Sequence, residues 1–211
     1  VKIGMVSVEE RENKKLKTGY TTGTSATAAA KAALLSIINQ TKIENVDVKL
    51  PKGSLIKIPI HSCQFYQEHA KCSVIKDGGD DPDVTHGAEI IVDLSFTDKI
   101  NEIEIDGGEG IGIVTKPGLG LELNKAAINP VPKKMINENL REITNEYNLK
   151  KGIKIIISVP KGKELGPKTD NPRIGIINGI SILGTSGIVI PFSTASYAAS
   201  IRQNLDVAIA M

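Results

Sequence analysis

The sequence is poor in aromatic residues and in cysteine. It contains no tryptophan, four tyrosines, three phenylalanines and two cysteines. So few rings leave few platforms for stacking bases, and a formal net charge of +2 is too small for a polyanion-binding surface. We therefore expect no nucleic-acid partner. Two cysteines cannot build a disulfide framework, so Cys63 and Cys72 are expected to be reduced thiols.

Long apolar runs and nucleotide-binding fingerprints are also missing. No run of about eighteen apolar residues occurs, and the N-terminal VKIGMVSVEERENKKLK lacks the apolar centre of a signal peptide. The sequence therefore predicts no membrane span and favours a cytoplasmic location. Neither GxxxxGK[ST] nor GxGxxG is present. The composition is that of a globular protein, and 211 residues suffice for one large domain or two small ones.

Residues 76–89, KDGGDDPDVTHGAE, form a segment dense in acids. Its glycines and its proline exclude a helix interior or a central strand, so it is predicted to be a loop. Apolar residues alternate before it at 70–74 and after it at 88–94, which predicts two strands that frame the loop. Loops held by rigid frames often carry chemistry. Its candidate catalytic residues are Asp77, Asp80, Asp81, Asp83 and His86.

Three interpretations of this acidic loop are open. In the functional one, the crowded carboxylates repel one another, and crowding tends to raise the pKa of at least one of them. In the second, the aspartates cap backbone amides of a solvated turn. The third is a calcium site, although the spacing lacks the order of an EF-hand and its closing glutamate.

A segment rich in glycine and hydroxyl groups, TGYTTGTS at 18–25, precedes an alanine-rich stretch that is predicted to be a helix over 26–39. Thr24 or Ser25 can serve as its N-cap. Free amides and the positive end of the helix dipole at such a start can bind a carboxylate or a phosphate. The alternative is an ordinary capped helix that packs closely through its alanines.

Several strands follow this helix, which argues for an α+β fold with a mixed or antiparallel sheet rather than a repeating βαβ array. A hairpin is predicted at 46–50 and 55–60, and further strands at 69–75, 88–96, 102–105 and 153–159. A helix is predicted at 133–148, a polar loop at 160–172 and a strand-like segment at 174–182.

The last predicted helix starts at Ser193 or Thr194 and runs to about residue 204. It follows a second turn of glycine and hydroxyl residues, Gly184-Thr185-Ser186-Gly187. The apolar run at 206–210 is predicted to begin another element.

Residues 107–120 contain a second concentration of glycine. Missing side chains let the backbone approach a ligand or a neighbouring strand, at an ordering cost of up to ~1 kcal/mol per residue relative to alanine. Either a large ligand or a tightly packed set of turns must offset this cost. Lys116 is the cation of this segment that would meet an anionic group.

Four possible zinc ligands, His61, Cys63, His69 and Cys72, lie close together in the sequence. Their spacing, HxC and then HxxC, does not match the paired motifs of zinc sites and distributes them along two strands. We therefore expect no bound metal.

Five segments together resemble one family. They are GYTTGT at 19–24, KDGGDDPDVTHGA at 76–88, GGEGIGIVTKPGL at 107–119, AINPVP at 127–132 and NPRIGIINGISILGTSGIVIPFS at 171–193. The chain is similar to the CbiD family, the cobalt-precorrin-5B C1-methyltransferases of anaerobic cobalamin biosynthesis. The resemblance implies an α+β domain at 18–192, related to ribosomal protein S5 domain 2. Residues 1–17 before it become polar and charged from Glu9 on, which predicts a mobile lead-in. The resemblance also implies that 193–211 begin a Rossmann-like domain that is largely absent from this chain.

The activity implied by the resemblance is methyl transfer from S-adenosylmethionine to C1 of a cobalt corrinoid, which gives cobalt-precorrin-6A. One carboxylate of the acidic loop would face the sulfonium or take a ring proton, with His86 as a proton carrier. The acidic loop, the glycine segment and the helix start would line one cavity that holds the carboxylate-rich ring. The implied substrate-binding residues are Thr21, Thr22, Thr24, Ser25, Gly108, Glu109, Gly110, Thr115, Lys116, Asn129, Gly184, Thr185, Ser186 and Gly187.

Two other functions remain open from the sequence. One is a small-molecule kinase with an S5-like fold, in which residues 118–126 or 184–187 would cradle phosphates. The other is a non-catalytic protein that binds a corrinoid. A homo-oligomer is compatible with each of these functions.

Overall fold

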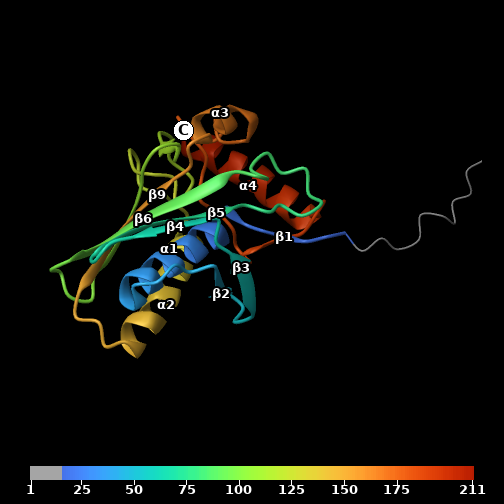
Figure 1. Cartoon of the computed structure of the whole chain (residues 1–211). Coiled ribbons are helices and arrows are strands. Elements are labelled where there is room, and N and C mark those ends of the chain that lie inside the picture. The colour runs from blue at the N-terminus through green and yellow to red at the C-terminus, as the bar shows by residue number, and fades with distance from the viewer. Residues whose placement is uncertain (1–15) are drawn as a thin grey trace, which may run out of the picture.

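A mixed five-stranded sheet forms the centre of the structure (Figure 1). The computed structural model describes residues 16–211. In order across the sheet, the strands are β4 (Ser62–Phe65), β5 (His69–Ile75), β6 (Glu89–Thr97), β9 (Gly152–Ser158) and β7 (Ile103–Gly107). Neighbours run antiparallel, except that β9 and β7 are parallel. The predicted mixed α+β sheet is thereby confirmed.

Two helices, α1 (Thr22–Asn39) and α2 (Pro130–Glu146), lie on one side of the sheet (Figure 1). The alanines of α1 are fully buried, and their small side chains let the helix lie close to β5 and β6. Strand alternation turns the even-numbered residues of β6 and the odd-numbered residues of β9 toward these helices. Each fully buried isoleucine of this core, such as Ile90 or Ile155, contributes about 1.5–3 kcal/mol relative to an exposed one.

Helix α2 connects the parallel strands β7 and β9. It begins at Pro130, three residues before the predicted start, because proline fits the first turn of a helix, where its missing N–H costs nothing. Its buried side chains recur at helical spacing and join the same core as α1. The buried Asn139 side chain bonds both the N–H and the C=O of Lys49, which fixes the neighbouring hairpin against α2.

That hairpin, β2 (Asn45–Lys49) and β3 (Leu55–Pro59), is antiparallel as predicted. Two short pairs of strands complete the sheets. β1 (Gly19–Tyr20) pairs with β11 (Ile188–Val189), and β8 (Ile113–Val114) pairs with β10 (Ile176–Ile177).

Three sequence predictions need correction. Strand β4 was not predicted, and the strand expected over 174–182 is limited to β10, because Asn178 adopts a left-handed conformation at φ 63°. The predicted loop at 160–172 contains α3 (Gly162–Leu165) and a 3-10 turn (Gly166–Lys168).

The last helix, α4 (Thr194–Ala210), is capped by Ser193 as predicted but continues six residues beyond the predicted end. The apolar run at 206–210 is therefore part of α4 and not a new element. Val207 is its buried residue, and it packs in a small cluster with Val114, Ala127 and Ile174. Within residues 16–211, none of the helices combines the length and the apolar character that crossing a bilayer requires.

The acidic loop connects β5 to β6, whose register closes with the pair Ile75 and Glu89, so the predicted two-strand frame is confirmed. The loop folds back on β1: Tyr20 N–H donates to the Asp77 carbonyl, and Asp80 N–H donates to the Lys17 carbonyl. Most of the predicted mobile lead-in, residues 1–15, lies outside the described residues. Lys17, its last residue, is held by the acidic loop.

We expect Gly79→Ala to destabilise the fold more than Gly87→Ala. Both glycines lie in the acidic loop with positive φ, 64° and 76°, so alanine strains the backbone at either position by about 1 kcal/mol. At Gly79 an added Cβ would also overlap the Lys17 carbonyl, whereas at Gly87 no atom lies within 4 Å. Urea unfolding of both variants should show a further loss of about 1–3 kcal/mol for Gly79→Ala. Equal losses would contradict a loop clamped to β1.

Candidate functional site

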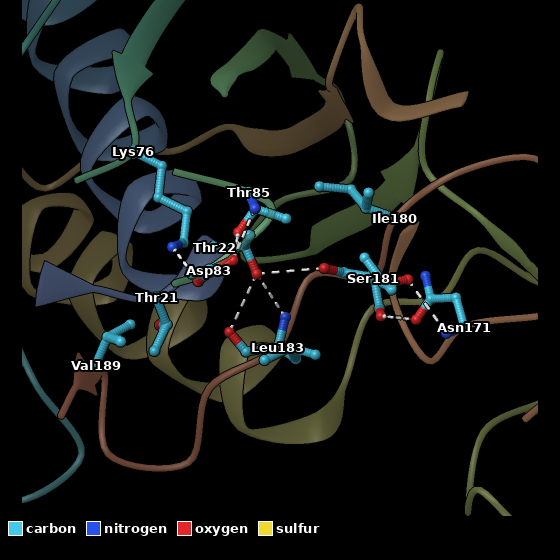
Figure 2. A pocket seen from close by; sticks show the side chains of 11 residues that line it. Thr21, Thr22, Lys76, Asp83, Thr85, Asn171, Ile180, Ser181, Leu183 and Val189 are labelled. Carbon is cyan, nitrogen blue, oxygen red and sulfur yellow. Dashed lines mark hydrogen bonds and ion pairs between the residues drawn. The ribbon is translucent and has the colours of Figure 1, made fainter. Parts of the chain in front are cut away.

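A cavity of about 100 Å³ lies where the acidic loop, the start of α1 and residues 169–189 meet (Figure 2). Its wall extends from Lys76, whose side chain is 2% exposed, to Leu183, which is 46% exposed. The residues that line it are Thr21, Thr22, Lys76, Asp83, Thr85, Thr169, Asn171, Ile180, Ser181, Leu183 and Val189.

The central feature of this cavity is an ion pair between Lys76 and Asp83. Lys76 Nζ donates to Asp83 Oδ2 at 2.6 Å, and Figure 2 shows the two side chains pointing toward each other. Asp83 Oδ1 accepts two further hydrogen bonds, from the Thr85 N–H at 2.7 Å and the Thr85 hydroxyl at 2.6 Å. A buried ammonium is costly unless it is paired, so Asp83 is what allows Lys76 to be there.

The pKa of Asp83 lies below its ordinary value. Burial is the largest influence and by itself would raise this pKa. The Lys76 ammonium and the two Thr85 donors together outweigh burial and hold the pKa down. Asp83 is therefore a carboxylate at neutral pH.

Lys76 was not among the predicted site residues, although the sequence contained a signal for it. Ala70, Cys72 and Val74 occupy the buried positions of β5. Lys76 continues this alternation one step beyond the strand, which places a charged residue on the side that faces the core.

The opposite wall is held by a chain of satisfied hydrogen bonds. The Thr22 hydroxyl accepts from the Leu183 N–H at 2.9 Å and lies 3.2 Å from the Ser181 carbonyl oxygen. The Ser181 hydroxyl donates to Asn171 Oδ1, and Asn171 Nδ2 donates to the Gly179 carbonyl. These polar groups bond one another, which fixes the shape of the cavity.

Amides at the start of α1 have protein partners, which argues against the predicted anion site there. Gly23 N–H donates to the Leu183 carbonyl at 3.0 Å, and Thr24 N–H donates to the Thr21 hydroxyl. Thr21 is the N-cap, in place of the predicted Thr24 or Ser25. The hydroxyls of Thr24 and Ser25 donate to the carbonyls of Gly187 and Thr21, and both residues are fully buried. The interpretation as an ordinary capped helix is confirmed.

The predicted turn of residues 184–187 packs against the N-terminal end of α1. Gly184 packs on the Thr21 side chain at φ 137°, and the Gly187 carbonyl accepts from the Thr21 N–H and the Thr24 hydroxyl. Thr185 is exposed, and the Ser186 hydroxyl donates to the Ile188 carbonyl.

Four of the five candidate catalytic residues of the acidic loop fix the loop itself. Asp77 accepts from Lys17 Nζ and the Gly79 N–H, and Asp80 accepts from the Lys17 N–H. Asp81 accepts from the Phe192 N–H at 2.9 Å. His86 Nδ1 accepts from the Gly78 N–H at 3.0 Å, which keeps a neutral ring protonated on Nε2. These bonds match the interpretation as a turn capped by aspartates, whereas Asp83 lines the cavity.

The raised pKa expected from crowding is not found at Asp77 or Asp83. The pKa of Asp77 is lowered by Lys17 and, to a smaller extent, by the Gly79 N–H. The pKa of Asp83 is lowered by Lys76 and Thr85, which outweigh the effect of burial. Each carboxylate has a lysine of its own, which offsets the repulsion between them.

The glycine segment lies apart from this cavity, so the hypothesis of one cavity lined by all three segments is wrong. Gly108 N–H donates to the Ile157 carbonyl, Glu109 accepts from the Val159 N–H, and Gly110 accepts from the Ile180 N–H. The segment therefore packs between β9 and residues 176–182, behind Ile180, as a set of tight turns.

Three further predicted binding residues also lie outside the cavity. The Thr115 hydroxyl donates to the Gly175 carbonyl, and Lys116 packs over Gly175 with Nζ 3.4 Å from the Arg173 carbonyl. Asn129 is the N-cap of α2, and its N–H donates to the Ile182 carbonyl.

The size of the cavity also limits what it can hold. A cavity of about 150 Å³ accommodates one benzene molecule. With about 100 Å³, the cavity at Lys76 has room for a short side arm of a ligand and not for a macrocycle.

A second, larger cleft of about 540 Å³ lies beside the edge strand β7. It contains side chains of both charges, with three lysines (Lys125, Lys133, Lys154) and three acids (Glu104, Asp106, Glu122). Its volume is in the range of small-molecule sites.

Residues 16–211 contain no group of three histidine, cysteine or acidic side chains placed to hold a metal ion. Cys63 and Cys72 are free thiols on paired positions of β4 and β5. His69 instead bonds Asp93 through Nε2 at 2.7 Å.

Comparisons with known proteins converge on one family. The family model described as CbiD matches residues 9–191. The chain is 52% identical over 198 residues to the cobalt-precorrin-5B C(1)-methyltransferase of Priestia megaterium, covering 94% of this chain and 54% of that protein. It is 52% identical over 191 residues to the protein of the same name from Picrophilus torridus, covering 90% and 55%. The chain thus spans about half the length of the curated relatives it matches.

A solved structure agrees with these matches. The crystal structure of the cobalamin biosynthesis protein (cbiD) from Archaeoglobus fulgidus superposes with a TM-score of 0.64 at 33% identity. The match covers 89% of this chain and 59% of that one.

We expect Asp83→Asn to lower the free energy of unfolding by about 3–5 kcal/mol near pH 7, because it leaves the Lys76 ammonium buried without a counter-charge. The folded pKa of Asp83 is below its unfolded value of ~3.9. The carboxylate therefore stabilises the fold above that value, and this contribution is lost as the pH falls through the folded pKa. The difference between wild type and variant should shrink below about pH 4.

Urea unfolding of wild type and variant between neutral and acidic pH measures this difference. Asp98→Asn is the control, because the Asp98 side chain is fully exposed and its loss should change little at any pH. A deficit of Asp83→Asn that stays constant with pH would contradict the role given to the ion pair.

Proposed function

The chain belongs to the CbiD family, and from this we propose that it acts in the methylation of C1 of cobalt-precorrin-5B by S-adenosylmethionine, which gives cobalt-precorrin-6A in cobalamin biosynthesis. The observation that carries the proposal is the 52% identity over 94% of this chain with a relative named for that reaction. The matched region includes the acidic loop and the other segments that line the cavity.

In the proposed reaction, S-adenosylmethionine supplies an electrophilic methyl group from its sulfonium. The contributions of the protein are alignment of the two reactants and exclusion of water. Ile180, Leu183 and Val189 give the cavity a carbon-rich wall that excludes water. The Lys76–Asp83 pair provides two fixed opposite charges at its buried end. The low pKa of Asp83 favours electrostatic stabilisation over proton transfer for this carboxylate.

We propose that the cleft beside β7 holds S-adenosylmethionine. Its volume of about 540 Å³ suits a ligand of nucleoside size, whereas the cavity at Lys76 is too small. Its lysines would bind the carboxylate of the methionine part, and its acids would bind the ammonium group and the ribose hydroxyls. Both kinds of side chain are needed for a ligand that carries charges of both signs.

The same family relationship supports finer proposals about the fold. We propose that residues 18–192 form a domain related to ribosomal protein S5 domain 2, and that α4 begins a Rossmann-like domain. In support, α4 exposes Tyr197, Ile201 and Leu205 and buries Val207. A cytoplasmic location, a homo-oligomer and the absence of a nucleic-acid partner remain predictions from the sequence.

The kinase alternative is not favoured by the geometry. A phosphate cradle needs backbone N–H groups that are free to point at the ligand. The Gly187 carbonyl accepts from the Thr21 N–H, so this turn presents an acceptor to the start of α1. Gly23 N–H donates to the Leu183 carbonyl, and Thr24 N–H donates to the N-cap hydroxyl.

We expect a chimera to retain methyl transfer when residues 16–191 of this chain replace their counterparts in the Priestia megaterium relative. The two sequences are 52% identical over 94% of this chain, so the rate should stay within about tenfold of the parent rate, or ~1.4 kcal/mol in barrier height. Transfer of a labelled methyl group from S-adenosylmethionine to cobalt-precorrin-5B is the measurement. A folded chimera that binds both reactants but transfers no label would contradict the proposed function.

We expect Lys133→Ala to weaken the binding of S-adenosylhomocysteine by roughly threefold to tenfold, since a partly exposed charge contributes about 1 kcal/mol. Lys134→Ala is the matched control, because Lys134 is the next residue, is 75% exposed and lies outside the cleft. Titration calorimetry measures both affinities. Equal effects of the two variants would contradict the proposal that S-adenosylmethionine binds in this cleft.

A further inference from the structure

The Lys76 ammonium has hydrogen-bonding capacity that the described part of the chain does not use. An ammonium group carries three N–H donors. Within residues 16–211, Asp83 is the one hydrogen-bond acceptor of Lys76 Nζ. The side chain is 2% exposed and lines the cavity, so its remaining donors are in a space that bulk water reaches poorly. A buried donor without a partner is unfavourable, and a ligand acceptor in the cavity would remove this penalty.

The other polar groups of the cavity are committed to protein partners. The Thr22 hydroxyl bonds the backbone at Ser181 and Leu183, and the Thr85 hydroxyl donates to Asp83. The cation is therefore the group of this site with the most to gain from a ligand. The complementary ligand group is a small anion with oxygen acceptors.

The lining and the volume narrow the choice of anion. Ile180, Leu183 and Val189 provide carbon surface in the lining of the cavity. A free inorganic anion would leave this surface without apolar contacts, whereas a carboxylate on a chain of one or two methylene groups would cover it. A volume of about 100 Å³ suits such an arm.

Asp83 repels a ligand carboxylate, so this ligand needs the Lys76 ammonium between the two carboxylates. Asp83 and a ligand carboxylate would share the Lys76 ammonium from two sides.

We propose that the cavity binds the carboxylate of a short aliphatic arm through Lys76, and that this arm positions the substrate for methyl transfer. The inference rests on the proposed function for the identity of the ligand. Two sources have the same chemistry, an acetate or propionate arm of the corrinoid and the carboxylate of S-adenosylmethionine. The corrinoid arm is the expected source, because the proposed donor cleft has lysines of its own.

The test compares ligands that differ only in this group. A cobalt corrinoid with free carboxylates is measured against the same ring with its carboxylates esterified, and S-adenosylmethionine against its decarboxylated form. The affinities are measured for wild type, Lys76→Met and the control Lys17→Met, which removes an exposed lysine that pairs with Asp77 outside the cavity. Methionine is unbranched, is one heavy atom shorter than lysine and carries no charge.

Lys76→Met should reduce the preference for the free-acid corrinoid over its ester by about tenfold or more, since a hydrogen bond to a charged group contributes roughly 1.5–3 kcal/mol. Lys17→Met should leave this ratio unchanged. If the ratio for S-adenosylmethionine falls instead, the carboxylate belongs to the donor and the cavity still binds a carboxylate. If neither ratio changes in the folded variant, the proposal is wrong.

Lys76→Met leaves Asp83 without its cation and can prevent folding, so the double variant Lys76→Met with Asp83→Asn is measured alongside it. Replacing both partners removes the buried charge altogether and is tolerated far better than removing one. The double variant should show the same loss of preference. Methyl transfer is recorded separately, so loss of the carboxylate preference and loss of the proposed reaction can be told apart.

Discussion

The buried ion pair between Lys76 and Asp83 is the interaction on which the site depends. Strand alternation places Lys76 on the core side of β5, where an unpaired ammonium would be strongly unfavourable. The acidic loop turns within seven residues to return a carboxylate to it. Thr85 then fixes that carboxylate with two hydrogen bonds. The acidic loop therefore follows the path that brings Asp83 to Lys76, and the cavity lies beside this ion pair.

The remaining aspartates of the loop hold this arrangement in place. Asp77 and Asp80 bind Lys17 on one side, and Asp81 binds the backbone at Phe192 on the other. Most aspartates of this cluster therefore hold the loop against neighbouring segments, although their crowding in the sequence suggested catalysis. Each carboxylate has its own hydrogen-bond donor, which offsets the repulsion within the cluster. Some of these donors, at Lys17 and Phe192, come from segments near the two ends of the described chain. One aspartate of the four is left to face the cavity.

Local patterns were sufficient to predict most of the fold. Period-two alternation identified β5, β6 and β9, and helical spacing identified α1 and α2. The errors concern partners that are distant in the sequence. The start of α1 looked open because the Thr22 hydroxyl and the Gly23 N–H find their partner far away in the sequence, at Leu183, and no local pattern reports it. The glycine segment looked like a ligand loop for the same reason, since β9 fills the space that its missing side chains leave. Lys76 could have been found by extending the alternation of β5 by one residue.

The position of β9 has a consequence for how the chain acquires its fold. β9 sits between β6 and β7, although it follows both in the sequence by many residues. Until residues 152–158 emerge from the ribosome, the apolar edge of β6 has no neighbour, and β7 has no sheet to join. The nascent chain must keep that edge from pairing with another molecule while it waits. Because an interior strand of the sheet is made last, the chain is more prone to aggregate during its synthesis than after it has folded.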